Sequence, residues 1–161
     1  MPARISVRPA RRKPPVKTAT PGILGSKQMI MKFGHVALSV ASITRAAAFY
    51  KKHFGLRLAK KYIHKDSGLT IAVIKKGHIT LELFEFKKHK ALPQYRKTLD
   101  SDLHTVGVKH FSVEVSDIHG VYKRFKKAHV RFATDLRVFD SNKRYFFIKD
   151  PDGNLVEIME P

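Results

Sequence analysis

The chain contains an internal repeat with an offset of 75 residues, and this repeat restricts the folds that it can adopt. The repeat is seen at these matched positions: His35 and His110, Val40 and Val115, Ile43 and Ile118, Tyr50 and Phe125, Val73 and Ile148, and segments 81–83 and 156–158. A repeat of this length indicates a duplicated supersecondary unit. A unit this small cannot bury the apolar face of its own sheet, so we expect the two copies to pair.

Each copy has the hydrophobic pattern of one strand, one helix and further strands. Alternation predicts strands, and apolar residues at three- and four-residue spacing predict helices. Ser42 and Asp117 are suited to begin the helices, and Gly55 is suited to end the first one. The predicted strands are 35–40, 69–74, 78–86, 110–115, 144–148 and 154–159, and the predicted helices are 42–54 and 117–128. The sequence therefore predicts an α+β fold made of two βαβββ modules.

The composition divides the chain into an extension and one globular domain. Residues 1–30 are rich in Pro, Arg and Lys and have no amphipathic period, which predicts a disordered basic extension. Residues 31–161 are predicted to form the domain, with the first module at about 33–88 and the second at about 108–161. The polar linker 89–107 is predicted to contain one short helix around 94–99.

The charge is strongly positive and unevenly distributed. The whole chain has a net charge of +19, and residues 1–32 hold eight basic residues and no acidic one. The extension could therefore bind nucleic acid, although the basic helices of the body lack the interleaved aromatic residues of a single-strand binding surface. The remaining 24 basic and 13 acidic residues would attract anionic small molecules. No apolar run approaches the roughly 20 residues that cross a bilayer, so we expect a cytoplasmic protein that does not bind membranes.

Each copy carries a His at the start of its first strand and a Glu within its last strand. His35 precedes Glu82 by 47 residues, and His110 precedes Glu157 by the same number. Both Glu residues stand between large aliphatic residues, where an unpaired carboxylate is costly to bury. One such Glu alone would be interpreted as a solvent-facing residue of an alternating strand. Two equivalent pairs, related by the pseudo-twofold symmetry of paired modules, instead predict four ligands around one point.

The ligand types limit the ion that could bind. The chain has no cysteine, which excludes thiolate metal sites, disulfides and a thiolate nucleophile. Two imidazoles and two carboxylates suit one divalent ion among nickel, zinc, cobalt, manganese and iron, with positions left open for water. We therefore predict a metal site of His35, Glu82, His110 and Glu157.

Several segments resemble the vicinal oxygen chelate superfamily, which includes glyoxalase I, bleomycin-resistance proteins, methylmalonyl-CoA epimerase, fosfomycin-resistance enzymes and extradiol dioxygenases. The resemblance covers residues 33–161. It rests on GHVALSV at 34–40, AAAFYKKHFGLRL at 46–58, LEL at 81–83, KHFSVEVSDI at 109–118 and DPDGNLVEIMEP at 150–161. It implies two paired, partly closed mixed sheets around a central metal site.

The predicted ligand set is similar to that of glyoxalase I, so the resemblance implies an enzyme like lactoylglutathione lyase. The metal would chelate two neighbouring oxygens of a hemithioacetal and stabilise an enediolate. Glu157 or Glu82 would move the proton between adjacent carbons as general base and then acid. Ser39 and Phe86 stand where bacterial glyoxalase I has an Arg and an Asn, so the contacts with glutathione differ.

Two other functions fit the same sequence. A ring-cleaving dioxygenase would need ferrous iron and a further acid–base His, for which His78 is the candidate. A ligand-binding module like the bleomycin-resistance proteins would need no chemistry. In each case the partner is a small molecule, and a homodimer is compatible with modules that pair by exchange between two chains.

Overall fold

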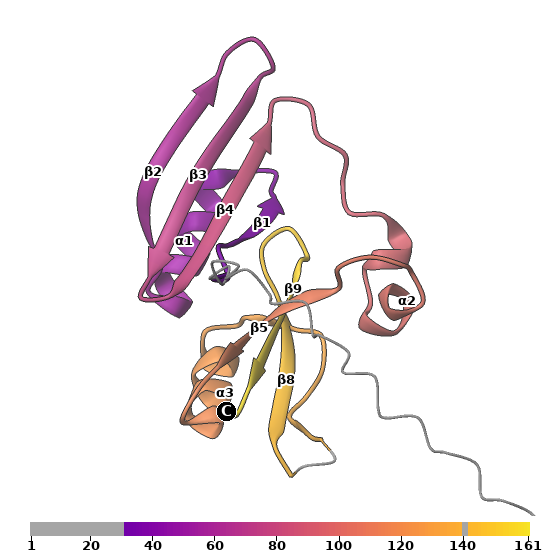
Figure 1. The fold of residues 1–161 in the computed structure, drawn as a ribbon. Coiled ribbons are helices and arrows are strands. Elements are labelled where there is room, and N and C mark those ends of the chain that lie inside the picture. The colour runs from indigo at the N-terminus through magenta and orange to yellow at the C-terminus, as the bar shows by residue number, and fades with distance from the viewer. Residues whose placement is uncertain (1–30, 140–141) are drawn as a thin grey trace, which may run out of the picture. The chain divides into compact units, whose positions relative to one another are not determined.

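The computed structural model describes residues 31–139 and 142–161. The predicted extension, residues 1–30, lies outside the described residues. Residues Phe33–Pro161 form one compact unit, which contains both copies of the repeat (Figure 1). In the part of the chain that the structure describes, no helix is long and apolar enough to cross a membrane.

The first module has the predicted order of one strand, one helix and three strands. Its elements are β1 (Val36–Ser39), α1 (Ile43–Phe54), β2 (Arg57–His64), β3 (Leu69–Lys76) and β4 (Ile79–Phe86). The sheet order is β1-β4-β3-β2, with β1 parallel to β4 and the other pairs antiparallel.

The second module repeats this order with one strand broken in two. Its elements are β5 (His110–Glu114), α3 (Ile118–Lys127), β6 (Arg131–Phe132), β7 (Arg137–Val138), β8 (Arg144–Lys149) and β9 (Leu155–Met159). The sheet order is β5-β9-β8-β6, and β7 also pairs with β8. β5 is parallel to β9, as β1 is to β4.

The linker contains η1 (Gln94–Arg96) and α2 (Leu99–Leu103) in place of the single short helix expected there. Asp102 is buried and accepts hydrogen bonds from Arg96 and Lys109, at 3.1 and 3.3 Å. These two cations lower the pKa of Asp102 against the opposing effect of its burial. The linker is therefore held in place by the buried Asp102 carboxylate, whose negative charge is balanced by Arg96 and Lys109.

Local signals in the sequence explain where the helices begin and end. The Ser42 side chain accepts a hydrogen bond from the Arg45 N–H, and the backbone N–H of Ile43 donates to Glu85 Oε2 at 2.5 Å. Gly55 ends α1 in the left-handed conformation at φ 74°, which glycine adopts without steric cost. Asp117 begins α3 by accepting from the Gly120 N–H.

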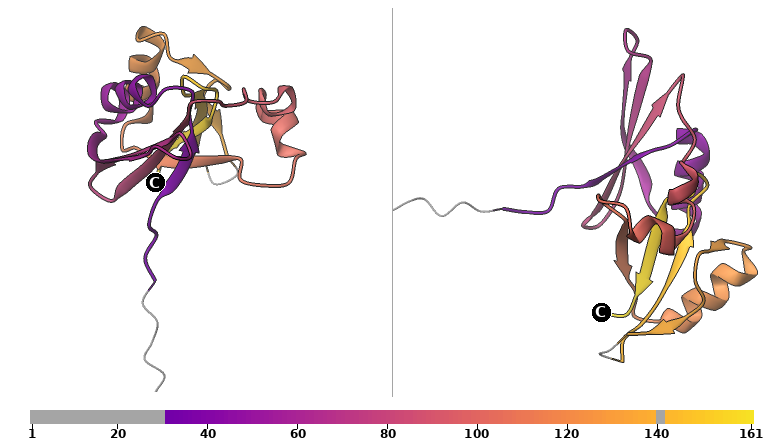
Figure 2. Two further views of the ribbon diagram at one scale, coloured as in Figure 1. Left: turned by 90° about the horizontal axis from the view of Figure 1, so that it is seen from above. Right: turned by 90° about the vertical axis from the view of Figure 1, so that its right-hand side faces the viewer.

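α1 and α3 each lie against one face of the sheet of their own module, as the two views of Figure 2 show. Leu81 and Leu83 of β4 belong to one buried cluster, and Val156 and Ile158 of β9 belong to the other. Side chains shared by both clusters connect them, namely Phe49, Phe54 and Phe111. The helix sides of the two modules are thus joined by aromatic packing.

The structure confirms the α+β class and the two mixed sheets. Within the described residues, however, the two sheets share no strand pair and do not close on each other. The partly closed arrangement that the resemblance implied is therefore not formed within this one chain.

The repeat is confirmed for the first and last strands of each module, but one matched position is wrong. Val73 is paired with Glu82, and its structural counterpart Phe147 is paired with Glu157. The predicted equivalence of Val73 with Ile148 is therefore off by one residue. The cause is the length of the connection, because nine residues lie between the paired Phe147 and Glu157 and only eight lie between the paired Val73 and Glu82.

Candidate metal centre

The parallel strand pairs place each His beside its Glu. Ala37 of β1 is in register with Glu82 of β4, and Ser112 of β5 is in register with Glu157 of β9. Each His stands two residues before the residue that is in register with the Glu. Because side chains two residues apart on a strand point to the same face, the His and the Glu meet on that face. The equal separation of 47 residues thus reflects the same register in both modules.

The two pairs have nearly the same geometry. His35 Nε2 lies 3.4 Å from Glu82 Oε2, and His110 Nε2 lies 3.3 Å from Glu157 Oε2. The exposed fractions of the side chains are 46% and 24% in the first pair and 30% and 18% in the second. Potential donor atoms of both residues therefore remain accessible, as a ligand site requires.

Both pairs lie on the sheet face that is turned away from the helix. Glu82 alternates with Leu81 and Leu83, which are buried on the helix side, and Glu157 alternates in the same way with its neighbours. The four predicted ligands are thus on the two open sheet faces of the domain.

The structure brings the ligands together as two pairs, and it does not bring the pairs together. Among the described residues, no group of three or more His, Cys, Asp or Glu side chains is placed to hold a metal ion. Two donors on one sheet face fit half of a four-ligand site. The binding of one ion by all four residues remains a prediction.

The surroundings of the two His residues differ. The ring of His110 meets the ring of Phe147 edge-on, with 4.9 Å between the centroids. His110 Nδ1 is buried and has no hydrogen-bond partner. In the first module, the position of Phe147 is taken by the smaller Val73. His110 is therefore held more rigidly by apolar packing than His35.

A cavity of about 640 Å³ adjoins His110. Its walls come from β1, the linker segment 89–93, the start of β5, and the turn 151–154 between β8 and β9. Asp152 also lines it, and its Oδ2 atom is buried without a partner. His110 thus borders a cavity that is large enough for a small metabolite.

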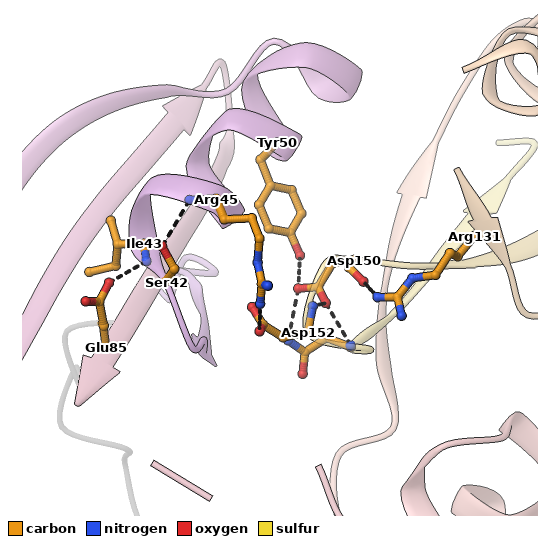
Figure 3. A network of polar contacts seen from close by, with 9 residues as sticks. Ser42, Ile43, Arg45, Tyr50, Glu85, Arg131, Asp150 and Asp152 are labelled. Atoms are coloured by element: carbon orange, nitrogen blue, oxygen red, sulfur yellow. Dashed lines mark hydrogen bonds and ion pairs between the residues drawn. The ribbon is translucent and has the colours of Figure 1, made fainter. Parts of the chain in front are cut away.

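A polar network beside this cavity joins the two modules (Figure 3). The Tyr50 hydroxyl donates to Asp150 Oδ2 at 3.0 Å, and Arg45 Nη2 pairs with Asp152 Oδ1 at 2.5 Å. Asp150 also accepts from the backbone N–H groups of Asp152 and Asn154. Burial, followed by the charge of Asp150, raises the pKa of Tyr50.

The sequence pattern does not predict this contact between the modules. The segment Asp150-Pro151-Asp152-Gly153 lies between the predicted strands 144–148 and 154–159, and in the structure it joins β8 to β9. Its contact with Tyr50 spans 100 residues of sequence, so no local pattern could predict it. An Asp beside Pro in a turn usually caps its own backbone, and Asp150 does this as well.

The remaining predicted residues take different places. Ser39 and Phe86 are both exposed, and both lie on the same sheet face as Glu82. His78 lies in the exposed turn before β4.

Comparison with known proteins gives one family and a set of distant relatives. The sequence model described as Glyoxalase/Bleomycin resistance protein/Dioxygenase superfamily matches residues 32–158. Human mitochondrial methylmalonyl-CoA epimerase is 24% identical over 140 residues, which are 84% of this chain and 77% of that protein.

Solved structures are similar in fold over most of the chain. A glyoxalase family protein from Enterococcus faecalis gives a TM-score of 0.69 at 24% identity, covering 80% of this chain and 97% of that one. The fosfomycin resistance protein FosX from Listeria monocytogenes, solved with manganese(II) and sulfate, gives 0.58 at 16% identity, covering 83% and 94%.

Proposed function

We propose that this chain, which belongs to the Glyoxalase/Bleomycin resistance protein/Dioxygenase superfamily, is a metal-dependent lyase or isomerase of the glyoxalase I type. Its substrate would be a small, oxygenated, anionic molecule. The observation that carries this proposal is the pair of equivalent His–Glu contacts, at 3.4 and 3.3 Å, on two open sheet faces.

A second copy of the chain would complete the metal site. The His35–Glu82 face of one copy would meet the His110–Glu157 face of the other, which gives two four-ligand sites in a symmetric dimer. Superfamily members bind divalent metals and often form dimers. When bound, the ion would act as a Lewis acid on neighbouring substrate oxygens.

The two carboxylates would carry the proton. Glu157 or Glu82 would take a proton from one substrate carbon as general base and return it to the adjacent carbon as general acid. The packing of His110 against Phe147 holds one end of this arrangement in place.

The charge of the chain supports an anionic substrate. Lys60 of β2 is in register with Val73, which is in register with Glu82, so all three side chains are on one sheet face. Lys60 would contribute a positive charge at the edge of that site. Ser39 and Phe86 on the same face give no cation for a glutathione carboxylate, and the human relative named above is an epimerase of a CoA thioester.

Metal content tests the ligand set. We expect about one divalent ion per chain after purification without chelator and loss of that ion in Glu82→Gln and in Glu157→Gln. Glu114→Gln is the matched control, because Glu114 is an exposed carboxylate of β5 that has no His partner among the described residues. Unchanged metal content in both site variants would contradict the ligand set.

Mixing the two inactive variants tests whether the site is shared between copies. When Glu82→Gln and Glu157→Gln chains are unfolded together and refolded, each mixed dimer contains one intact site and one doubly substituted site. We expect about a quarter of the wild-type sites to return. No recovery despite mixed dimers would show that each site is formed within a single chain.

Activity separates the proposed chemistry from mere binding. Metal-reconstituted protein should convert methylglyoxal with glutathione or exchange the α-proton of a CoA thioester for deuterium. A protein that holds the metal and turns over neither substrate class would contradict the lyase or isomerase assignment. A protein that holds no metal would instead be a ligand-binding module.

A further inference from the structure

A groove of about 270 Å³ lies on the other side of the domain's sheets from the His–Glu pairs. It is formed where the end of α1, the end of β3 and one side of α3 meet. Ile158 and Phe125, which belong to the helix-side core of the second module, form part of its lining. Glu157 points to the opposite face, so this groove is separate from the proposed metal centre.

Four permanent positive charges line the groove, and no acidic residue does. Lys51 and Lys52 come from the last turn of α1, Lys76 from the end of β3 and Arg124 from α3. Within the described residues, none of these four side chains forms an ion pair with a carboxylate. Side chains from three separate elements therefore place positive charges without carboxylate partners around this groove.

The backbone at Gly55 lets one of these cations lie close to the helix end. A Cβ atom at position 55 would lie 3.1 Å from the Lys76 Nζ atom and 3.3 Å from its Cδ atom. The Lys76 side chain therefore lies directly over the last turn of α1. Arg124 Nη2 approaches the backbone oxygen of His53 at 3.5 Å, and its guanidinium lies over the Phe125 ring at 5.3 Å.

Stabilisation of the helix end does not account for so many cations. The C-terminus of a helix acts as about half a negative elementary charge, and this effect falls off within the last turn. The hydrogen bonds of Gly55 and Leu56 to Lys51 and Tyr50 already satisfy carbonyls at this end. Four cations exceed the helix dipole several-fold, so the groove retains a large positive surplus.

His53 lines the groove, and the positive charge there affects its pKa. Its ring packs on Phe49 and Phe125, with centroid distances of 4.8 and 5.4 Å. Burial lowers the pKa of His53, and the charges of Lys52 and Arg124 lower it further. A negative ligand among these cations would act in the opposite direction and raise this pKa.

We propose that the groove at the end of α1 binds a small phosphate-type anion, of the size of inorganic phosphate or pyrophosphate. Ammonium and guanidinium groups from three elements suit a compact anion with several oxygens and more than one charge. The volume of about 270 Å³ accommodates such an anion. This site is independent of the metal chemistry proposed above.

The test measures the pKa of His53 by NMR in the full chain at constant ionic strength. Pyrophosphate and phosphate should each raise this pKa in a saturable way, whereas acetate at the same ionic strength should not. The double variant Lys76→Gln, Arg124→Gln should bind pyrophosphate at least about tenfold more weakly. The matched control is Lys61→Gln, Lys123→Gln, which removes two exposed charges outside the groove and should bind as the wild type does.

Three results would overturn the proposal. The first is an unchanged His53 pKa at saturating pyrophosphate. The second is an equal rise with acetate, which would indicate charge screening alone. The third is equal weakening of pyrophosphate binding in both double variants, which would indicate attraction by net charge rather than by this groove. Circular dichroism of both variants establishes that they fold.

Discussion

The two modules carry the same His–Glu pair in different surroundings. In the first module, His35 is the more exposed and the residue opposite Glu82 is Val73. In the second, His110 packs edge-on against Phe147 and also borders the 640 Å³ cavity. Strand register alone determines the contact within each pair, because both modules have it. The side chains on the neighbouring strand and the linker determine how firmly each pair is held.

The largest difference in stability between the modules should come from substitutions at the positions opposite the two Glu residues. Phe147→Ala removes a side chain that is 5% exposed, and we expect a loss of about 3–5 kcal/mol in the free energy of unfolding. Val73→Ala removes only two methyl groups, so its cost should be about 1.5–2 kcal/mol. Urea denaturation of both variants measures this difference. Equal losses would show that the second pair is not the more firmly packed.

The contact that joins the modules should have the next largest effect. Tyr50→Phe removes one of several hydrogen bonds to the buried Asp150 carboxylate, and we expect a loss of about 1–3 kcal/mol. The pKa of Tyr50 is raised, so its contribution to stability is complete below the unfolded pKa of about 10 and decreases as the pH rises above it. The decrease in stability from about pH 9 to 11 should therefore be smaller in Tyr50→Phe than in the wild type. The same slope in both proteins would contradict this role of Tyr50.

Substitution of the two His residues should give a smaller difference in stability, with the larger loss again in the second module. His110→Ala removes the edge contact with Phe147, and we expect a cost of about 1 kcal/mol. His35→Ala should change the stability by less than about 0.5 kcal/mol, since its side chain is nearly half exposed. Thermal unfolding of the metal-free protein compares them without the contribution of bound metal. A larger cost at His35 would reverse the comparison.

The smallest effect should come from exchanging equivalent residues. Ala37 and Ser112 are exposed and occupy the same position in register with Glu82 and Glu157. Ala37→Ser should change the free energy of unfolding by less than about 0.5 kcal/mol. It should also leave the His35 environment unchanged in an NMR spectrum. A large change in the chemical shifts of His35 would show that Ala37 and Ser112 do not occupy equivalent positions.

Sequence patterns predicted the elements that bury one face and missed those that do not. The helices α1 and α3 were predicted to within one residue by their caps and apolar faces. The sequence pattern predicts no bounds for β2, because all eight of its residues are exposed and neither of its faces is buried. β6 and β7 have two residues each, which is too short for a detectable period.

The duplication and the contact within each His–Glu pair follow from the spacing of residues along the chain. Parallel pairing of the first and last strands, with equal numbers of residues between them, places His and Glu on one face in both modules. The separation of the two pairs onto different open faces, with no cluster of three or more ligands among the described residues, depends instead on how the modules pack. The way in which the modules meet depends on the aromatic contacts of Phe49, Phe54 and Phe111 and on the Tyr50–Asp150 hydrogen bond. These contacts join residues far apart in sequence, and a repeat period carries no information about them.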